Sequence, residues 1–187
     1  DGEILVRGEL VMHGYWRNPV ETAKALEGGW LHTGDIGMFD DKGRLKITDR
    51  KKDIIVNDKG DNVSPQKVEG MLTLQPEIGQ AMVSGDRRPY LVGLLVHDAE
   101  WMRDWAKANG TGAGLDDVRD NPAFHAALSQ AVDRVNAELT VTEKVRRFVL
   151  ADEAFTIDNA EMTPSMKIRR HMIGKRYKDR LDSLYKA

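Results

Sequence analysis

The stretch Leu91-Val92-Gly93-Leu94-Leu95-Val96 decides the fold of most of this chain. A continuous apolar run of this length is typical of a β-strand that is buried on both faces. Residues 80–84 and 147–150 predict two further strands, one before this run and one after it. We therefore expect a small sheet that is flanked by helices.

Helical segments lie on both sides of this run in the sequence. Ser64-Pro65 is a typical helix start, with serine as the N-cap and proline in the first turn, and Asp98 and Asn121 cap two later helices. The helix after Asn121 carries apolar residues at helical spacing, which are Phe124, Leu128, Ala131, Val132, Val135 and Leu139. Such a stripe fits core packing or a groove for a partner helix, and we favour core packing. A last helix is predicted over residues 168–185.

The N-terminal part of the chain has a different, β-rich pattern. Residues 2–12 predict a strand with a bulge or bend at Gly8, and residues 40–43 predict a hairpin turn. Residues 49–53, Asp-Arg-Lys-Lys-Asp, place five charges between apolar strands, which predicts an exposed connector. The predicted fold class is thus α+β, with a small β-rich part at residues 1–49 and an α/β domain at residues 50–187. Because the chain begins without Met inside a predicted strand, we expect a C-terminal piece of a longer protein.

Composition narrows the class of function. The chain has 187 residues, of which 41% are hydrophobic and 31% charged, as in ordinary soluble domains. A formal net charge of -2 argues against nucleic acid as a partner. Cysteine is absent, which excludes thiolate chemistry and fits a cytoplasmic location, and the five histidines lack metal-ligand spacing, so we expect no protein-held metal. No apolar run of about eighteen residues predicts a membrane span, although peripheral membrane contact stays open.

Two residues suggest chemistry on an anionic substrate. Lys167 follows Thr163-Pro164-Ser165-Met166, a stretch too short and proline-punctuated for a helix interior, so its ammonium group should project from a loop. Asp35 follows Thr33-Gly34, a predicted turn, and a carboxylate there could accept two hydrogen bonds from a ribose diol. Together they indicate nucleotide-dependent activation of a carboxylate. Taken alone, each also fits a surface charge or an ordinary turn.

Three further residues are candidates for the same site. Arg50 carries a planar donor fork that could reach a ribose hydroxyl or a phosphate, and a solvated surface charge is the alternative. Lys52 lies in the predicted connector, where a hinge between two domains would be placed. Gly60 lies in a predicted tight loop, where the missing Cβ atom permits close approach of a ligand, with an ordinary turn as the alternative.

These motifs, in this order, resemble the C-terminal part of the adenylate-forming superfamily of acyl-CoA synthetases, peptide-synthetase adenylation domains and luciferases. Residues 2–22 resemble a strand motif near the end of the large domain, and residues 29–35 resemble the ribose-binding motif. Residues 43–53 and 60–69 resemble the hinge and the loop after it, and residues 163–167 resemble the C-terminal lysine motif. An apparent extra residue in the loop 57–65 and additional helices between Val96 and Val145 make long-chain fatty acyl-CoA ligases the closest likeness.

The resemblance implies an acid–thiol ligase that uses ATP, Mg²⁺ and coenzyme A. A fatty acid is first activated as an acyl-adenylate, and the thiol of coenzyme A then displaces AMP. Lys167 is implied as the catalytic residue, Asp35 and Arg50 as ligands of the ribose or phosphate, Lys52 as the hinge, and Gly60 as part of the loop that approaches coenzyme A. A missing N-terminal domain of the same protein would hold the rest of the site, so the fragment alone should be inactive.

Two alternatives stay open from the sequence. One is a sister enzyme that makes only acyl-adenylate or passes the acyl group to a carrier-protein thiol. The other is a stand-alone, non-catalytic interaction module derived from this domain. Identification of the acceptor thiol distinguishes the sister enzyme from a coenzyme A ligase. An upstream reading frame distinguishes a fragment of a larger enzyme from a stand-alone module.

Overall fold

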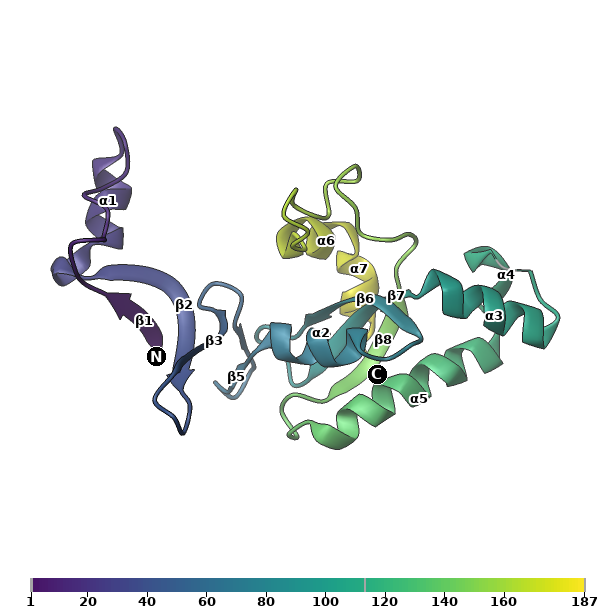
Figure 1. Cartoon of the computed structure of the whole chain (residues 1–187). Helices are drawn as coiled ribbons and strands as arrows, with labels where there is room; N and C mark the ends of the chain where they lie inside the picture. Colours follow the sequence, from purple (N-terminus) through teal and green to yellow (C-terminus); the bar gives the residue numbers. More distant parts are fainter. Residues whose placement is uncertain (1, 113, 187) are drawn as a thin grey trace. The chain divides into compact units, whose positions relative to one another are not determined.

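The computed structural model describes residues 2–112 and 114–186. The chain divides into two compact units, the first ending at Ile54 and the second beginning at Ile55 (Figure 1). The elements are helices and small antiparallel and mixed sheets, which confirms the predicted α+β class.

The first unit is built on an antiparallel sheet of three strands. From edge to edge these are β1 (Glu3–Val6), β2 (Leu31–Phe39) and β3 (Leu45–Arg50). The turn between β2 and β3 lies where the sequence predicts it. The Asp40 carboxylate closes this turn by accepting hydrogen bonds from the backbone N–H groups of Lys42 and Arg44, both at 2.9 Å.

The predicted strand over residues 2–12 is wrong beyond Val6. The chain turns there, and the backbone N–H of Val11 donates to the carbonyl oxygen of Gly8 at 3.1 Å. Gly8 has a φ of +153°, which favours glycine, so the glycine ends the strand instead of bending it. The chain then passes through a helix, α1 (Pro19–Ala25), and a 3₁₀ turn, η1 (Glu27–Gly29), before it enters β2.

The second unit contains a mixed sheet and a small hairpin. The strands of the sheet, in spatial order, are β6 (Ile78–Ser84), β7 (Leu91–His97) and β8 (Val145–Leu150). β7 pairs antiparallel with β6 and parallel with β8. The hairpin consists of β4 (Ile55–Val56) and β5 (Asn62–Val63).

The central strand β7 is buried on both faces, as the sequence predicts. Leu91 and Leu95 belong to one hydrophobic cluster, whereas Val92 and Leu94 belong to a second cluster on the opposite face. This alternation follows from the two-residue period of a β-strand. Helices cover both sides of the sheet (Figure 1). Four of them contribute residues to the first cluster, namely α2 (Pro65–Thr73), α3 (Ala99–Asn109), α4 (Leu115–Val118) and α5 (Pro122–Glu138). The second cluster contains residues of α6 (Arg170–Arg176) and α7 (Lys178–Ser183).

The apolar stripe of α5 is core, which confirms the favoured interpretation. Phe124, Leu128 and Ala131 are fully buried in the first cluster, together with residues of the sheet and of α2. The helix begins where predicted, because the side chain of Asn121 accepts a hydrogen bond from the backbone N–H of Ala123 at 2.9 Å.

The prediction of one helix over residues 168–185 is wrong. Ile168 forms a β-bridge with Met162, and the helical segment that follows is divided at Tyr177 into α6 and α7. The Tyr177 side chain is buried in the second cluster, and its hydroxyl accepts a hydrogen bond from the backbone N–H of Asp152 at 3.1 Å. The break therefore coincides with an aromatic ring that is anchored in the core.

In the part of the chain that the structure describes, no helix combines the length and the apolar character needed to cross a membrane.

Candidate functional site

The predicted turn at Thr33-Gly34-Asp35 is instead part of strand β2. Gly34 has a φ of +71°, which distorts the strand locally without ending it. Asp35 remains paired with Arg50 of β3 in the strand register. The side chains of this pair also meet, with Arg50 Nε 3.3 Å from Asp35 Oδ1. Two predicted site residues are thus brought together by β-sheet pairing.

A residue that sequence reasoning missed holds this segment in place. Glu3 of β1 accepts hydrogen bonds from the backbone N–H of Gly34 at 3.0 Å and from Lys51 Nζ at 2.9 Å, and it also contacts His32 Nδ1 at 3.2 Å. The hydrogen bonds from Lys51 and His32 lower the pKa of Glu3 to about 2. An acidic residue beside the apolar run Ile4-Leu5-Val6 is the signal that could have identified it.

A pocket of about 380 Å³ lies beside this segment, within the first unit. Four of its lining residues, Lys24, Arg50, Lys51 and Lys52, are basic, and the two acidic ones, Glu3 and Glu21, pair with Lys51 and Lys24, so the basic residues are in excess. Thr33 and Gly34 form part of the wall. A carboxylate close to a basic pocket is suited to a ligand that has both hydroxyl and phosphate groups, such as a nucleotide.

Lys52 is exposed and lies in a turn directly after β3. The backbone N–H of Asp53 closes this turn by donating to the carbonyl oxygen of Arg50 at 2.9 Å. The turn lies just before the division between the two units, which falls after Ile54.

Gly60 occupies the tip of the β4–β5 hairpin, in the second unit. The side chain of Asn57 organises this loop by accepting hydrogen bonds from the backbone N–H groups of Lys59 at 2.9 Å and Asp61 at 2.8 Å. Gly60 has a φ of +87°, and a Cβ atom built there would meet nothing within 4 Å. The glycine is therefore required by the backbone conformation, and the space beside it is open.

Lys167 lies in a loop, as the sequence predicts. The backbone N–H of Thr163 donates to the carbonyl oxygen of Lys167 at 2.8 Å, and the Thr163 hydroxyl accepts a hydrogen bond from the Lys167 N–H at 3.1 Å. The bridge between Met162 and Ile168 closes the base of this turn, so residues 163–167 form a tight hairpin, called here the lysine hairpin. The Lys167 side chain is exposed, and its ammonium group has no ion-pair partner among residues 2–112 and 114–186.

Two acidic residues fix the base of the lysine hairpin. The carbonyl oxygen of Glu161 accepts the backbone N–H of Arg169 at 2.7 Å, and its buried carboxylate lies 3.1 Å from Arg176 Nη1. Arg170, three residues after Lys167, forms an ion pair with Glu69 of α2. Sequence reasoning missed both roles, because Glu69 is distant in the chain and because nothing near Glu161 in the sequence indicates that its carboxylate is buried beside Arg176.

No group of three or more histidine, aspartate or glutamate side chains that could hold a metal ion occurs in the described residues.

Comparison with protein-family models gives one match. The model is described as the AMP-binding enzyme C-terminal domain, and it matches residues 52–187.

Curated relatives cover nearly the whole chain. The long-chain-fatty-acid–CoA ligase FadD15 of Mycobacterium tuberculosis is 38% identical over 187 residues, which are 99% of this chain and 31% of the relative. Long-chain-fatty-acid–CoA ligase 1 of Homo sapiens is 34% identical over 189 residues, with 99% of this chain and 27% of the relative covered. The chain thus spans less than a third of the length of these relatives.

Two of the solved structures with the same fold contain adenylation domains of carboxylic acid reductases. The adenylation domain of a carboxylate reductase from Mycobacterium chelonae matches with a TM-score of 0.84 and 26% identity, covering 100% of this chain and 28% of that chain. The A-PCP didomain of a carboxylic acid reductase from Segniliparus rugosus, in complex with AMP, matches with a TM-score of 0.82 and 26% identity, covering 99% of this chain and 25% of that chain.

Proposed function

Because this chain belongs to the family of AMP-binding enzyme C-terminal domains, we propose that it is the C-terminal part of an ATP-dependent long-chain fatty acid–CoA ligase. The observation that carries this proposal is the 38% identity to a long-chain-fatty-acid–CoA ligase over 99% of the chain. The remaining part of the site belongs to an N-terminal domain of the same protein, and the fragment alone is inactive.

The proposed reaction has two steps. A carboxylate oxygen of the fatty acid attacks the α-phosphorus of ATP, the bond to the β-phosphate oxygen breaks, and pyrophosphate leaves. The sulfur of coenzyme A then attacks the acyl carbonyl carbon, and the bond between acyl carbon and AMP oxygen breaks. The thiol proton is released, and the products are the acyl thioester and AMP.

Lys167 acts in the first step in this proposal. Its exposed ammonium group, on the residue that ends a short and internally hydrogen-bonded hairpin, is available to an anionic centre. Negative charge develops on the transferring phosphoryl group and on the leaving pyrophosphate, and a preorganised cation stabilises it. The tight hairpin keeps the lysine backbone fixed, so only the side chain has to be ordered when the substrate binds.

Asp35 and Arg50 hold the nucleotide in this proposal. The Asp35 carboxylate accepts hydrogen bonds from the ribose hydroxyls, and Arg50 binds a ribose hydroxyl or a phosphate. Their sheet pairing supports these roles, as does the pocket that Arg50 lines together with Gly34, the neighbour of Asp35 in the chain. We propose that Mg²⁺ arrives with ATP, since the described residues offer no acidic cluster for it. The ion would neutralise phosphate charge.

Lys52 and Gly60 serve the change between the two steps in this proposal. Residues 1–49 belong to the large domain and residues 50–187 to a mobile domain, with Lys52 as the hinge residue. The loop that contains Gly60 approaches the pantetheine chain of coenzyme A in the second step. The open space beside Gly60 supports this role. We place the whole enzyme in the cytoplasm and leave peripheral contact with a membrane open.

A carrier-protein thiol is the alternative acyl acceptor. One of the solved structures that match this fold is an A-PCP didomain, and this match is the reason to test a carrier protein as the acceptor. Full-length protein supplied with a long-chain fatty acid and ATP separates the two candidates. We expect acyl-CoA to form when coenzyme A is added. Acyl-adenylate that accumulates with coenzyme A but is consumed by a carrier protein would contradict the ligase assignment.

A further inference from the structure

The turn between β6 and β7 supports the loop that contains Gly60. Residues 86–88 of this turn make three hydrogen bonds to residues 56–58. The backbone N–H of Arg87 donates to the carbonyl oxygen of Val56 at 2.8 Å, and the backbone N–H of Asp58 donates to the carbonyl oxygen of Arg88 at 3.2 Å. The Asp86 carboxylate accepts the backbone N–H of Val56 at 3.3 Å. A displacement of this turn would therefore also move Asp58, which lies two residues before Gly60.

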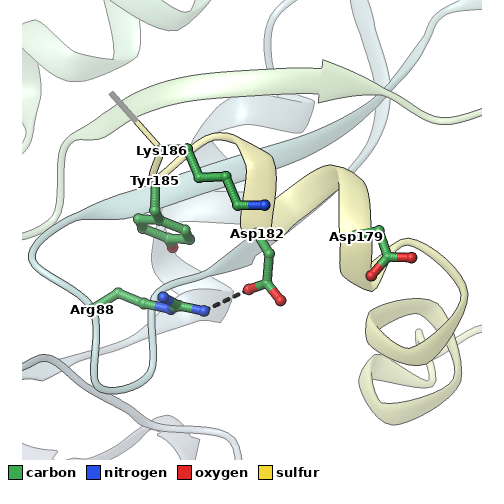
Figure 2. A pocket seen from close by; sticks show the side chains of 5 residues that line it. All are labelled: Arg88, Asp179, Asp182, Tyr185 and Lys186. Atoms are coloured by element: carbon green, nitrogen blue, oxygen red, sulfur yellow. Dashed lines mark hydrogen bonds and ion pairs between the residues drawn. The ribbon is translucent and has the colours of Figure 1, made fainter.

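The Arg88 side chain anchors the same turn to the last helix. Figure 2 shows its guanidinium beside both the Asp182 carboxylate and the Tyr185 ring. The distance from Arg88 Nη2 to Asp182 Oδ1 is 2.5 Å, and the guanidinium carbon lies 4.7 Å from the centre of the Tyr185 ring. A guanidinium can pair with a carboxylate in its plane and stack on a ring with its face, whereas an ammonium group offers no such face.

Tyr185 reinforces this contact from the other side. Its hydroxyl donates to the carbonyl oxygen of Ser84 at 3.1 Å, just before the turn, and Tyr90 after the turn donates to the carbonyl oxygen of Leu184 at 3.0 Å. Burial raises the pKa of Tyr185 to about 12, so the hydroxyl stays protonated and remains a donor at neutral pH. Both ends of the turn are thus tied to residues 184–185.

Close packing does not hold the Arg88 side chain. A pocket of about 370 Å³ lies beside it, lined by Arg88, Asp179, Asp182, Tyr185 and Lys186. The guanidinium depends on its ion pair and ring contact for its position. Replacement of Arg88 therefore removes these interactions without opening a cavity in either hydrophobic cluster, because Arg88 belongs to neither.

We propose that Arg88 is a positioning residue for the Gly60 loop, which it acts on through the turn between β6 and β7. This inference rests on the proposed function, in which the Gly60 loop serves the coenzyme A step. Arg88 touches no substrate in this role. The residue acts by keeping Asp58, and with it Gly60, in the conformation that accepts coenzyme A.

The test compares Arg88→Gln with Arg87→Gln in the full-length protein. The two variants lose the same charge in the same turn, but the Arg87 side chain is 92% exposed and lies 3.9 Å from its nearest acidic partner, Asp86. For Arg88→Gln we expect kcat/KM for coenzyme A, measured with preformed acyl-adenylate, to fall about tenfold, with ATP–pyrophosphate exchange within about twofold. We also expect faster hydrogen exchange at the Asp58 amide. Arg87→Gln should match the parent in all three measurements.

A second variant tests whether the effect of Arg88→Gln arises from the loss of its ion pair. Asp182→Asn breaks the same ion pair from the helix side, but it also removes the contact between Lys178 Nζ and Asp182 Oδ2 at 2.6 Å, so Lys178→Gln is its control. Beyond the effect of Lys178→Gln, combining Asp182→Asn with Arg88→Gln should add little to the loss caused by Arg88→Gln alone. Equal loss in both half-reactions, or an unchanged exchange rate at Asp58 in Arg88→Gln, would overturn the proposal. If the parent itself forms no acyl-CoA, the proposed function fails, and the Asp58 exchange still tests the structural link on its own.

Discussion

Arg170 and Glu69 form a two-pronged ion pair that joins the start of α6, three residues after Lys167, to helix α2. The two terminal guanidinium nitrogens of Arg170 contact the Glu69 carboxylate, with Nη1 2.7 Å from Oε1 and Nη2 bonded to Oε2. The same Oε1 accepts the backbone N–H of Val83 at 2.7 Å, so the pair is also attached to strand β6. Because α2 begins directly after the β4–β5 hairpin, this pair links Lys167 and the Gly60 loop in one framework.

We expect Glu69→Gln to destabilise the second unit by about 1.5–3 kcal/mol, because it leaves the half-buried Arg170 without a counter-charge. The measurement is the free energy of unfolding in urea. Glu153→Gln is the matched control, since it makes the same change at an exposed pair with Arg176 and should cost less than about 1 kcal/mol. Similar losses for the two variants would show that the Glu69 pair has no special structural role.

Lys167→Ala in the full-length protein should slow adenylate formation about 10²–10³-fold, because it removes a preorganised cation from the phosphoryl-transfer step. The reaction of preformed acyl-adenylate with coenzyme A should be largely spared. ATP–pyrophosphate exchange and single-turnover thioester formation measure the two steps separately. Lys175→Ala, at another exposed lysine of the same unit, should leave both unchanged. Loss of both steps to the same extent in Lys167→Ala contradicts the assigned role.

Asp35→Asn should raise KM for ATP about tenfold, because the neutral amide forms weaker hydrogen bonds with the ribose hydroxyls than the carboxylate does. Steady-state kinetics with varied ATP give this value. Asp41→Asn changes an exposed carboxylate in the β2–β3 turn and provides the control. A KM that stays at the parental value in Asp35→Asn would remove Asp35 from the nucleotide site.

Glu3 should make the first unit sensitive to acid. Its pKa is lowered from 4.5 to about 2, so its stabilising effect is complete above pH 4.5 and is lost as the pH falls toward 2. The Gly34 amide donates to this carboxylate, and its NMR chemical shift should therefore titrate with a midpoint near 2. Lys51→Met removes the strongest of the interactions that lower this pKa, and the midpoint should rise. A midpoint near 4.5 in the parent would contradict the contact.

Local sequence patterns predicted the elements whose causes are local. The apolar run of β7, the stripe of α5 and the Ser64 cap of α2 were all confirmed, because burial and capping follow from neighbouring residues. The segment around Gly34 was predicted wrongly as a turn, because Gly-Asp is a common turn pair and the strand depends on distant partners. The break at Tyr177 likewise involves a contact with Asp152, which no helical periodicity reveals.

In the candidate site, too, only the features with local causes could be predicted from the sequence. The loop position of Lys167 followed from its own Thr-Pro approach, and the roles of Lys167, Asp35, Arg50, Lys52 and Gly60 stay predictions. The supporting residues Glu3, Glu69 and Arg88 each contact a distant partner, which is Gly34, Arg170 or Asp182 and lies 31, 101 or 94 positions away in the chain, respectively. A single sequence gives no sign of such pairs, because any of its many acidic residues could meet any arginine.

Both hydrophobic clusters described above draw all their residues from Ile55 onward. A unit that has its own core can be combined with different upstream domains during evolution, because such an exchange exposes none of that core. Chimaeras whose junction lies at residues 50–54 should therefore remain folded more often than chimaeras joined inside the β6–β7–β8 sheet. The same property would let the upstream partner change while the unit that carries Lys167 is kept.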